Sequence, residues 1–479
     1  MFPKFRHFFM FALMALPVCA ANTTLRLSET EAIRMALEKN LAIQVRSFNP
    51  KLADARLLSE KGAFDPQFNA GLTRNELDDK RLGLSTANDS VFSSISGLLP
   101  WGATYDLGTD SLWRDKGGVG WDTSLDLTVR QPLLQGFGTD VNLAQIRIAR
   151  RSKLISEWEL RAQVIDTVTE VIFRYNELYQ SMENFDVAVR FQDLAQQLLS
   201  DNEKRMEIGV MSPLDVTEAR AQVAQRKEAV ILSRRAIQNN QNFLKQLVTD
   251  DVSGFLKTDI EIVRPTMQPA PDLDVEKGIS DALQLRPDYR SALLDLEQRQ
   301  IRVVFTQNRV LPRLDLVASL GLLGVDGAYV SSLDRSLNGR DRESWSAGVQ
   351  FGIPLGNREA RGSAKASKLE EARALVALKQ LEQSIIVEVD NAAGAIITAR
   401  ERVTSTRESL RLARETLQAG SERLKAGVGT TFTVLQFQRD LAEAAAAEIR
   451  ARTDLNQAVA EYERATGTTL GRRNIDVEW

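Results

Sequence analysis

The sequence has little of what most enzymes use for catalysis. Its 479 residues include one histidine, His7, and one cysteine, Cys19, both within the first twenty positions. If that segment is removed on export, no imidazole and no thiol remain. Ser–His, Cys–His and zinc chemistry are then excluded, because each needs one of these groups. We therefore expect no enzyme activity, no catalytic residue, no cofactor and no metal site.

Aromatic residues, excess positive charge and long apolar runs are scarce as well. Aromatic residues make up 6% of the chain and the formal net charge is −3. Helices are therefore favoured over a large β core, and the chain carries no basic footprint for nucleic acid. After the N-terminus no stretch approaches about 18 consecutive apolar residues, which a transmembrane helix needs. Passage through a membrane would require strands closed into a barrel.

The first twenty residues, "MFPKFRHFFMFALMALPVCA", predict a secretory signal. A basic start, an apolar run and small residues before Ala20 favour cleavage after that position. A transmembrane anchor is the alternative, but the apolar run is too short to span a bilayer comfortably. Cys19 leaves a lipid anchor open, although Val18 is a poor match for the small residue that precedes a lipid-modified cysteine.

The rest of the chain holds two copies of one plan. The stretches "EKRMEIGVMSPLDVTEA" and "SERLKAGVGTTFTVLQF" align without a gap, so that Gly209 falls on Gly427 and Val216 on Val434. "AIRMALEKNLAI" likewise matches "GISDALQLRPDY", and "LTVRQPLLQG" matches "VQFGIPLGNR". Each copy reads helix, proline, strand, loop, strand, Pro-Leu, very long helix, Gly-Val tip, helix.

This plan divides the chain into segments. We expect a signal peptide at 1–20, a first repeat at 21–250, a mixed segment at 251–275, a second repeat at 276–470 and a tail at 471–479. The first repeat would hold a helix, strands 64–74 and 120–131, a long helix 138–208, a tip 209–213 and a helix 214–249. The second would hold a helix 276–310, strands 312–323 and 344–354, a long helix 357–426, a tip 427–431 and a helix 432–465.

Both long helices are well marked. The apolar residues of the first follow a coiled-coil spacing, and neither helix contains proline over nearly 70 residues, about 100 Å of helix. The half-length helices would stack end to end, 214–249 with 276–310 and 432–465 with 29–60, beside one long helix each. A coiled-coil rod closed on its own core is the alternative, and it leaves the strands unexplained.

The strands have the pattern of a membrane barrel. "WDTSLDLTVRQ" alternates an apolar and a polar face over about ten residues, as lipid-facing strands do. Trp121 and Trp345 would then lie at the membrane interface, whereas a soluble sandwich edge is the alternative. Two strands per copy give four per chain, too few to close a barrel of about eight strands. Segment 91–110 adds either further strands or an external loop.

Together these features resemble one family, the TolC-type outer-membrane efflux channels of double-membraned bacteria. The resemblance covers essentially the whole chain after the signal, and its specificity comes from the order of the motifs. The stretches that carry it are "LSETEAIRMALEKNLAI", "FDPQF", "RQPLLQGFG", "ALQLRPD" and the two Gly-Val tips. It implies a mainly α fold with a small β part: long antiparallel helical hairpins forming an α-barrel, and four strands per chain in a shared trimeric β-barrel, with an equatorial belt around 251–275.

The resemblance also implies a function and partners. A homotrimer embedded in outer-membrane lipid would dock on a periplasmic adaptor, itself coupled to an inner-membrane transporter, and would export cargo passively in efflux or type I secretion. The tip turns that contact the adaptor would be Gly209, Val210, Ser212, Pro213, Gly427, Val428 and Gly429. An exported periplasmic coiled-coil adaptor or tether without a pore is the alternative.

The gate residues differ from the family pattern. Acidic residues in the tips commonly form rings that narrow the entrance, and Asp215 occupies such a place in the first tip. The usually acidic positions of the second tip carry Thr433 and Gln436. Arg205 and Arg423 are candidates to latch the closed tip. The two halves of the gate are therefore not equivalent, and the sequence does not identify the cargo.

Overall fold

The computed structural model describes residues 24–79, 84–114, 120–265, 273–339 and 342–475. The expected signal peptide, with His7 and Cys19, lies outside this part. The chain forms two compact units, which we call the tip unit and the sheet unit and describe separately. The tip unit comprises 1–40, 167–270 and 397–458, and the sheet unit comprises 41–166, 271–396 and 459–479. None of the described helices is both long and apolar enough to cross a membrane.

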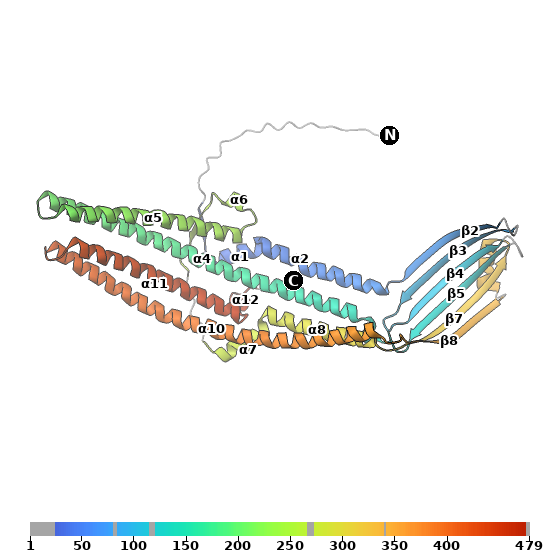
Figure 1. The fold of residues 1–479 in the computed structure, drawn as a ribbon. Helices are drawn as coiled ribbons and strands as arrows, with labels where there is room; N and C mark the ends of the chain where they lie inside the picture. The colour runs from blue at the N-terminus through green and yellow to red at the C-terminus, as the bar shows by residue number, and fades with distance from the viewer. Residues whose placement is uncertain (1–23, 80–83, 115–119, 266–272, 340–341, 476–479) are drawn as a thin grey trace, which may run out of the picture. The chain divides into compact units, whose positions relative to one another are not determined.

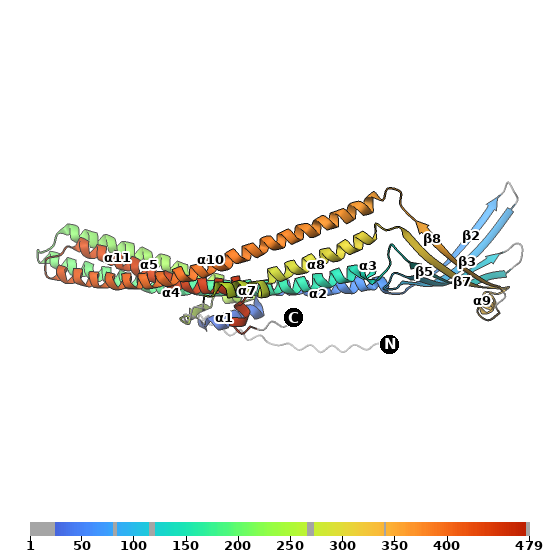
Figure 2. The same ribbon diagram turned by 90° about the horizontal axis from the view of Figure 1, so that it is seen from below.

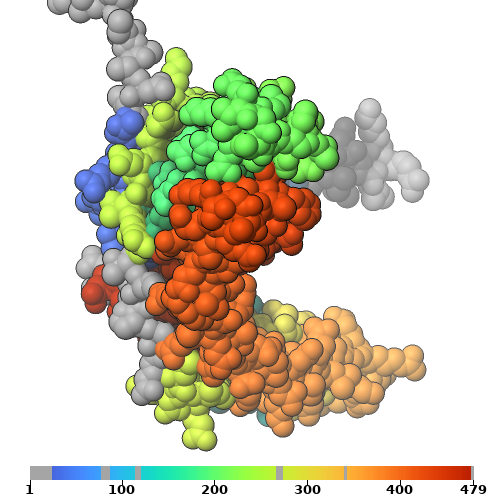
Figure 3. Space-filling view, turned by 90° about the vertical axis from the view of Figure 1, so that its left-hand side faces the viewer, coloured from blue at the N-terminus to red at the C-terminus, as the bar shows by residue number. Residues whose placement is uncertain are grey.

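The tip unit is built on two helical hairpins. One joins α4 (Ala144–Glu207) to α5 (Pro213–Val248), and the other joins α10 (Arg358–Lys425) to α11 (Thr431–Ala465). The parts of these helices within the unit run side by side to their turns (Figures 1 and 2). Seen end on, the two turns are neighbours, one green and one orange-red (Figure 3). α4 and α10 contain 64 and 68 residues, so the two repeats have long helices of matching length.

A small sheet completes the tip unit. β1 (Thr24–Leu27) pairs in parallel with β6 (Asp259–Ile262). α1 (Glu29–Lys39) follows β1, begins with a capping box between Ser28 and Glu31, and packs on α5. The fully buried Tyr175 of α4 brings its hydroxyl within hydrogen-bond distance of the Leu27 and Val263 carbonyls. The segment before α1 is thereby fixed to α4. The short helix α6 (Val252–Phe255) precedes β6.

The helices of the sheet unit lie along the first parts of α4 and α10. α2 (Leu41–Lys61), followed by η1 (Gly62–Phe64), contacts α4 through the ion pair of Lys153 with Asp54. α7 (Val275–Leu285) leads into α8 (Pro287–Asn308), which contacts α10 through Arg299 and Glu370. The unit also contains the short helices α3 (Thr139–Asn142) and α12 (Thr469–Arg472). The helix expected at 138–208 is thus divided at Leu143.

The end of α11 meets the start of α8. Arg286, which precedes α8, donates a hydrogen bond of 3.0 Å to the carbonyl of Ala465, the last residue of α11. We had expected helix 432–465 to continue onto 29–60, and this pairing was wrong. The two half-length helices have similar lengths, so length alone could not distinguish the partners.

A six-stranded antiparallel sheet forms the other end of the sheet unit (Figures 1 and 2). Its order is β2-β3-β4-β5-β7-β8, with bounds Gln67–Asp79, Leu84–Leu98, Thr104–Arg114, Gly120–Pro132, Arg313–Asp326 and Arg342–Gly352. The mainly helical fold with a small β part is confirmed, but the expected count of four strands is too low. Residues 84–114 form a hairpin within the sheet, which answers the question left open for 91–110. Serines on both faces of β3 weakened its alternating pattern.

A short helical segment covers part of one face of this sheet. α9 (Tyr329–Asp334) continues into the π-helical turn η2 (Arg335–Gly339) and lies against β5 and β7 (Figure 2). Gly324 of β7 permits the close approach, because a Cβ there would lie 2.3 Å from the carbonyl oxygen of Ser332. The Ser332 hydroxyl bonds to Thr123, which bonds to Ser111. The helix therefore satisfies polar groups on a face that is otherwise largely apolar.

Candidate functional site

The two tip turns have the same hydrogen bonds. In the first, Gly209 has a φ of 77° and its N–H donates to the carbonyl of Met206, while the N–H of Val210 donates to the carbonyl of Arg205. In the second, Gly427 has a φ of 76° and its N–H donates to the carbonyl of Leu424, while the N–H of Val428 donates to the carbonyl of Arg423. Both turns are Schellman motifs, in which glycine takes the left-handed conformation that ends a helix. The repeated Gly-Val pair is thus explained by backbone geometry.

The helices restart after each turn with a different cap. Ser212 accepts a hydrogen bond from Leu214 and Pro213 occupies the first position of α5. In the second tip the Thr430 hydroxyl accepts from the N–H of Thr433 at 3.3 Å and also contacts the Thr433 hydroxyl. The side chain of Thr433 therefore takes part in the cap of α11.

Apolar side chains pack the helices of both hairpins behind the turns. Val216 and Val434 are equivalent in the repeat, and both are buried. Each belongs to a small apolar cluster. The first contains Leu199, Val216, Ala219 and Val223, and the second contains Leu198, Leu424, Val434, Leu435 and Leu417. Because Leu198 of α4 joins the second cluster, the two hairpins share this cluster.

Polar contacts also connect the two hairpins. Arg205 of α4 donates to the Leu424 carbonyl of α10 at 3.0 Å. The buried Asn202 donates to the hydroxyl of Thr431 at 3.3 Å, and Thr431 also contacts the sulfur of Met211. These three contacts all pair the first hairpin with the second. We call them the cross-tip contacts.

The two predicted arginines make different contacts in the structure. Arg205 takes part in the cross-tip contacts, whereas the equivalent Arg423 is exposed and offers only its carbonyl to Val428. The Leu424 carbonyl lies at the C-terminal end of α10 and already accepts the N–H of Gly427, which leaves one lone pair for a second donor. The guanidinium of Arg205, from the neighbouring hairpin, is that second donor.

The predicted gate residues lie one turn from the tips. Asp215 is half-buried in the first turn of α5, Thr433 is half-buried in the first turn of α11, and Gln436 is exposed. The position equivalent to Gln436 in the first hairpin is Glu218, which lies three residues beyond Asp215 on the same helix face. The first two turns of α5 thus carry two carboxylates per chain, Asp215 and Glu218, whereas α11 carries Thr433 and Gln436 at the equivalent positions.

Sequence reasoning missed two other tip residues. Leu214 and Phe432 occupy equivalent positions and are 66% and 58% exposed, beside the exposed Val210 and Val428. Apolar residues at the first turn of a helix are common in sequence and carry no signal of their own. Their exposure is informative because large apolar side chains clustered on a surface mark interaction sites.

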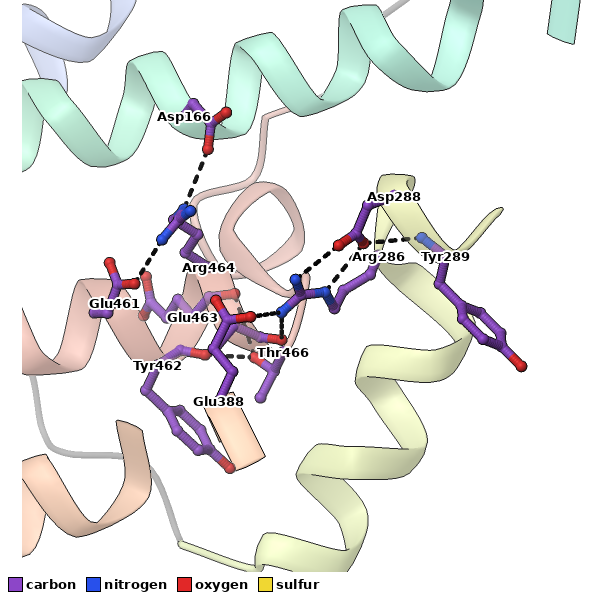
Figure 4. A network of polar contacts seen from close by, with 11 residues as sticks. Asp166, Arg286, Asp288, Tyr289, Glu388, Glu461, Tyr462, Glu463, Arg464 and Thr466 are labelled. Atoms are coloured by element: carbon purple, nitrogen blue, oxygen red, sulfur yellow. Dashed lines mark hydrogen bonds and ion pairs between the residues drawn. The ribbon is translucent and has the colours of Figure 1, made fainter. Parts of the chain in front are cut away.

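A second polar constellation lies in the sheet unit, at the junction of α7 and α8 (Figure 4). The Arg286 side chain, only 13% exposed, bonds to Asp288 and Glu388 at 2.8 Å each, and to the Ala465 carbonyl. Burial opposes ionisation of Asp288, but the bonds and charge of Arg286 outweigh it and hold the pKa of that carboxyl below its usual value. The "LRPD" motif is therefore a structural junction.

Arg464 forms the neighbouring part of this constellation (Figure 4). It bonds to Glu461 one turn back on α11 and to Asp166 of α4, at 2.6 and 3.1 Å. Burial disfavours its charge, but the two carboxylates outweigh this effect and raise the pKa of the guanidinium. The network binds α4, α8, α10 and α11 together and leaves no acid–base pair of catalytic kind.

The two predicted interface tryptophans lie at different levels of the sheet. Trp121 is opposite Asp326 and packs edge-on against Tyr329, with ring centres 5.2 Å apart. Trp345 is opposite Leu320 and is 79% exposed. Six residues of β7 separate the two levels, about 20 Å at the rise of a strand. They do not belong to one ring of aromatic side chains.

These features define a class of protein: a duplicated chain of long helical hairpins, with matched Schellman tips and one antiparallel sheet. The chain belongs to the Outer membrane efflux protein family, whose profile matches residues 32–249 and 278–468. The resemblance to TolC-type channels is thereby confirmed, and the family is one of channels rather than enzymes.

Solved structures share the fold. The outer membrane protein VceC from Vibrio cholerae is 17% identical, with a TM-score of 0.71 over 92% of this chain and 96% of that chain. The CmeC outer membrane channel of Campylobacter jejuni is also 17% identical, with a TM-score of 0.67 over 98% and 94% of the two chains. At these identities the likeness concerns the fold alone.

Curated relatives match over a shorter stretch. The fusaric acid resistance protein FusA of Burkholderia cepacia is 24% identical over 254 residues, which is 52% of this chain and 43% of that protein. The solvent efflux pump outer membrane protein SrpC of Pseudomonas putida is 25% identical over 237 residues, 49% of this chain and 47% of that protein. The matches thus span about half the length of these relatives.

Proposed function

We propose that the protein is the outer-membrane duct of an export system, a homotrimer that passes cargo through its centre without chemistry. The observation that carries this proposal is the pair of matched, exposed tips connected by the cross-tip contacts. Such an arrangement suits a gate, because both hairpins can end in the same turn and still separate when a few contacts break.

Apolar surface on α2 supports an oligomer. Four of its residues follow the 4-3-4 spacing of a helix seam and are 55–68% exposed: Leu41, Val45, Phe48 and Leu52. A stripe of this kind on a single chain is covered when a second copy packs against it. Three copies would place these helices around a common axis, as in the family's trimers.

The gate opens, in this proposal, when Arg205 leaves the Leu424 carbonyl. That bond and the Asn202–Thr431 contact connect the hairpins of one chain, so their loss leaves apolar packing through Leu198 to hold the α4–α5 turn against the second hairpin. A periplasmic adaptor would supply the energy by binding the exposed apolar side chains of the tips, Val210 and Leu214 on one hairpin and Val428 and Phe432 on the other. The inner-membrane transporter would act through that adaptor.

Cargo and location follow the same proposal. We assign the chain to the outer membrane, with the signal cleaved after Ala20 in preference to lipid attachment at Cys19. The two relatives named above are a fusaric acid resistance protein and the outer membrane protein of a solvent efflux pump, so small organic molecules are the first cargo class to test. A periplasmic tether without a pore would instead be soluble without detergent.

Asp215 provides the direct test of the gate. Three copies would place carboxylates around the entrance, and a ring of fixed charge selects ions of opposite sign. Replacement Asp215→Lys should shift the reversal potential in planar bilayers towards anions. The matched control, Thr433→Lys, places the same charge at the equivalent position of the second tip. If Asp215→Lys leaves the reversal potential unchanged, Asp215 does not line the pore. If the protein forms no channel in the bilayer, the proposal of an export duct is wrong.

A further inference from the structure

The hairpin of β3 and β4 is an integral part of the sheet. Its turn has Gly102 at a φ of 99°, where a Cβ would lie 2.2 Å from the Gly136 carbonyl oxygen. Gly138 donates to the Trp101 carbonyl at 3.1 Å, and Asn142 donates to the carbonyls of Gly136 and Gly138. The turn is therefore fixed to the segment that leads from β5 into α4.

The register places one apolar row across all six strands. Its members face one another in successive strand pairs and are 37–79% exposed: Phe68, Ile95, Leu107, Leu127, Leu320 and Trp345. The next row, on the opposite face, consists of polar residues and glycine: Asn69, Ser94, Gly108, Asp126, Gly321 and Ser344. An external loop has no need of this alternation, whereas a strand between lipid and water requires it.

Both edge strands of the sheet, β2 and β8, have one unpaired side among the described residues. Among the described residues β2 pairs with β3 alone and β8 with β7 alone. These edge strands contain 13 and 11 residues, carry neither proline nor lysine, and have exposed apolar side chains such as Leu72 and Val349. Soluble proteins often protect the edge strands of their sheets with proline or lysine. Since six strands alternate in direction, β2 of one copy runs antiparallel to β8 of the next.

We infer that all six strands of each chain enter one shared barrel, in which β2 of one copy pairs with β8 of a second copy. This inference rests on the trimer of the proposed function. Three six-stranded sheets make eighteen strands, against the twelve that the resemblance implied. Barrel diameter grows roughly linearly with strand number, so the outer opening is about 1.5 times as wide as a twelve-stranded barrel. The hairpin adds no helix, so only the strand barrel widens.

Lipid contact at the hairpin tests the inference in the intact protein. In a Cys19→Ser background, single cysteines at Ile95 and Ser94 are labelled with a fluorophore in liposomes that contain nitroxide lipids. Ile95→Cys should be quenched by the lipid and Ser94→Cys should not, because neighbouring residues face opposite sides. Leu320→Cys on β7 is the reference for a lipid-facing site in the same row.

A deletion measures the width. Removing residues 84–114 deletes the two strands β3 and β4, so β2 and β5 remain antiparallel. Phe68 can then pair directly with Leu127, and the apolar row stays continuous. Averaged electron micrographs of detergent-extracted particles should show a barrel about 1.5 times wider for the full chain than for the deletion. If the deletion does not assemble, the lipid experiment alone decides.

The outcomes separate the inference from the proposed function. Quenching at Leu320 without quenching at Ile95, or equal barrel widths, would place the hairpin outside the barrel and overturn the inference alone. Absence of quenching at Leu320 would show that the sheet does not meet lipid and would overturn both. Quenching at Ile95 and Leu320, with the wider barrel, supports the eighteen-stranded arrangement.

Discussion

The two hairpin tips share a backbone and differ in the side chains around it. Gly209 and Gly427 make the same Schellman turn, but the position four residues before Met206 is the buried Asn202, whereas its equivalent is Gly420. A Cβ at Gly420 would lie 2.5 Å from the ring of Phe437. Duplication thus preserved the turn and left the packing behind it free to diverge.

The divergence has a direction. The first tip supplies the donors Asn202 and Arg205, and the second supplies the acceptors Thr431 and the Leu424 carbonyl. Only the donor Asn202 has no counterpart, because its equivalent is Gly420, whereas both tips have the arginine and a backbone carbonyl. A second pair of equivalent residues also differs between the repeats: Asn40 makes a neutral bond to the Leu247 carbonyl, whereas Arg286 has a charged network.

Substitutions at the equivalent residues Arg286 and Asn40 should show the largest difference in stability between the repeats. Arg286→Ala removes a largely buried cation and leaves Asp288 and Glu388 without it, which should cost about 2–3 kcal/mol of unfolding free energy after allowance for their partial exposure. Asn40→Ala removes a neutral hydrogen bond and should cost about 1 kcal/mol. Denaturant unfolding of the extracted protein, followed by circular dichroism, measures both. Equal losses would contradict the assigned difference.

Acid should reduce the contribution of Arg286. The pKa of Asp288 is lowered in the folded protein from its usual 3.8. A lowered pKa stabilises the fold above the unfolded value, and this stabilisation is lost as pH falls below 3.8 through the folded value. The gap between the parent protein and Arg286→Ala should therefore narrow below that pH. A constant gap would show that Asp288 does not contribute.

Exchanging packing residues between the tips should have the next largest effect. Gly420→Asn introduces the side chain found in the first repeat and collides with Phe437, which should cost about 2 kcal/mol as overpacking. Adding Phe437→Ala recreates the first repeat's combination of Asn202 and Ala219 and should recover most of the loss. Unfolding midpoints of the single and double variants test the compensation, and a double variant no better than Gly420→Asn would refute it.

Removing the cross-tip arginine should affect the gate more than the fold. Arg205→Ala deletes a charge-assisted bond worth about 1.5 kcal/mol. If that bond exists only in the closed state, the closed-to-open ratio falls about tenfold. Arg423→Ala removes an exposed side chain at the equivalent position and serves as the control. Single-channel recordings should show more opening for Arg205→Ala alone, and equal behaviour of the two variants would exclude Arg205 as the latch.

Substitution of the turn glycines should have the smallest effect on stability, and the effect should be the same in both repeats. Gly209→Ala and Gly427→Ala each force a side chain into the left-handed region, and neither meets a neighbour within 4 Å, so each should cost about 1 kcal/mol. Gly429→Ala should cost more, because its Cβ would lie 2.9 Å from the backbone nitrogen of Leu424. Unequal losses at Gly209 and Gly427 would mean that the turns are not equivalent.

Local signals in the sequence located the elements that depend on neighbouring residues. The turns at Gly209 and Gly427 and the cap at Ser212 depend on backbone preferences a few residues long, and the sequence pattern carries these directly. The long helices likewise follow from an apolar seam and the absence of proline. Order along the chain was sufficient to identify the family.

Contacts between distant segments could not be read in this way. Arg205 and Arg423 are equivalent in sequence, and only packing decides which of them reaches a carbonyl on the other hairpin. The sequence left the β3–β4 segment open between further strands and an external loop, because its strands mix serine with apolar residues and neither strand shows clear alternation. The row across six strands becomes visible only when the register is known.

The small parallel sheet of the tip unit has a consequence for how the chain folds. β1 pairs Thr24 with Asp259, so a strand at the start of the described residues depends on a strand far along the chain. Such a contact has high sequence separation, and closing so long a loop is slow and entropically costly. β1 therefore cannot pair until β6 has emerged, although α1 can already pack on α5. The N-terminal strand must remain unpaired while the first repeat is synthesised.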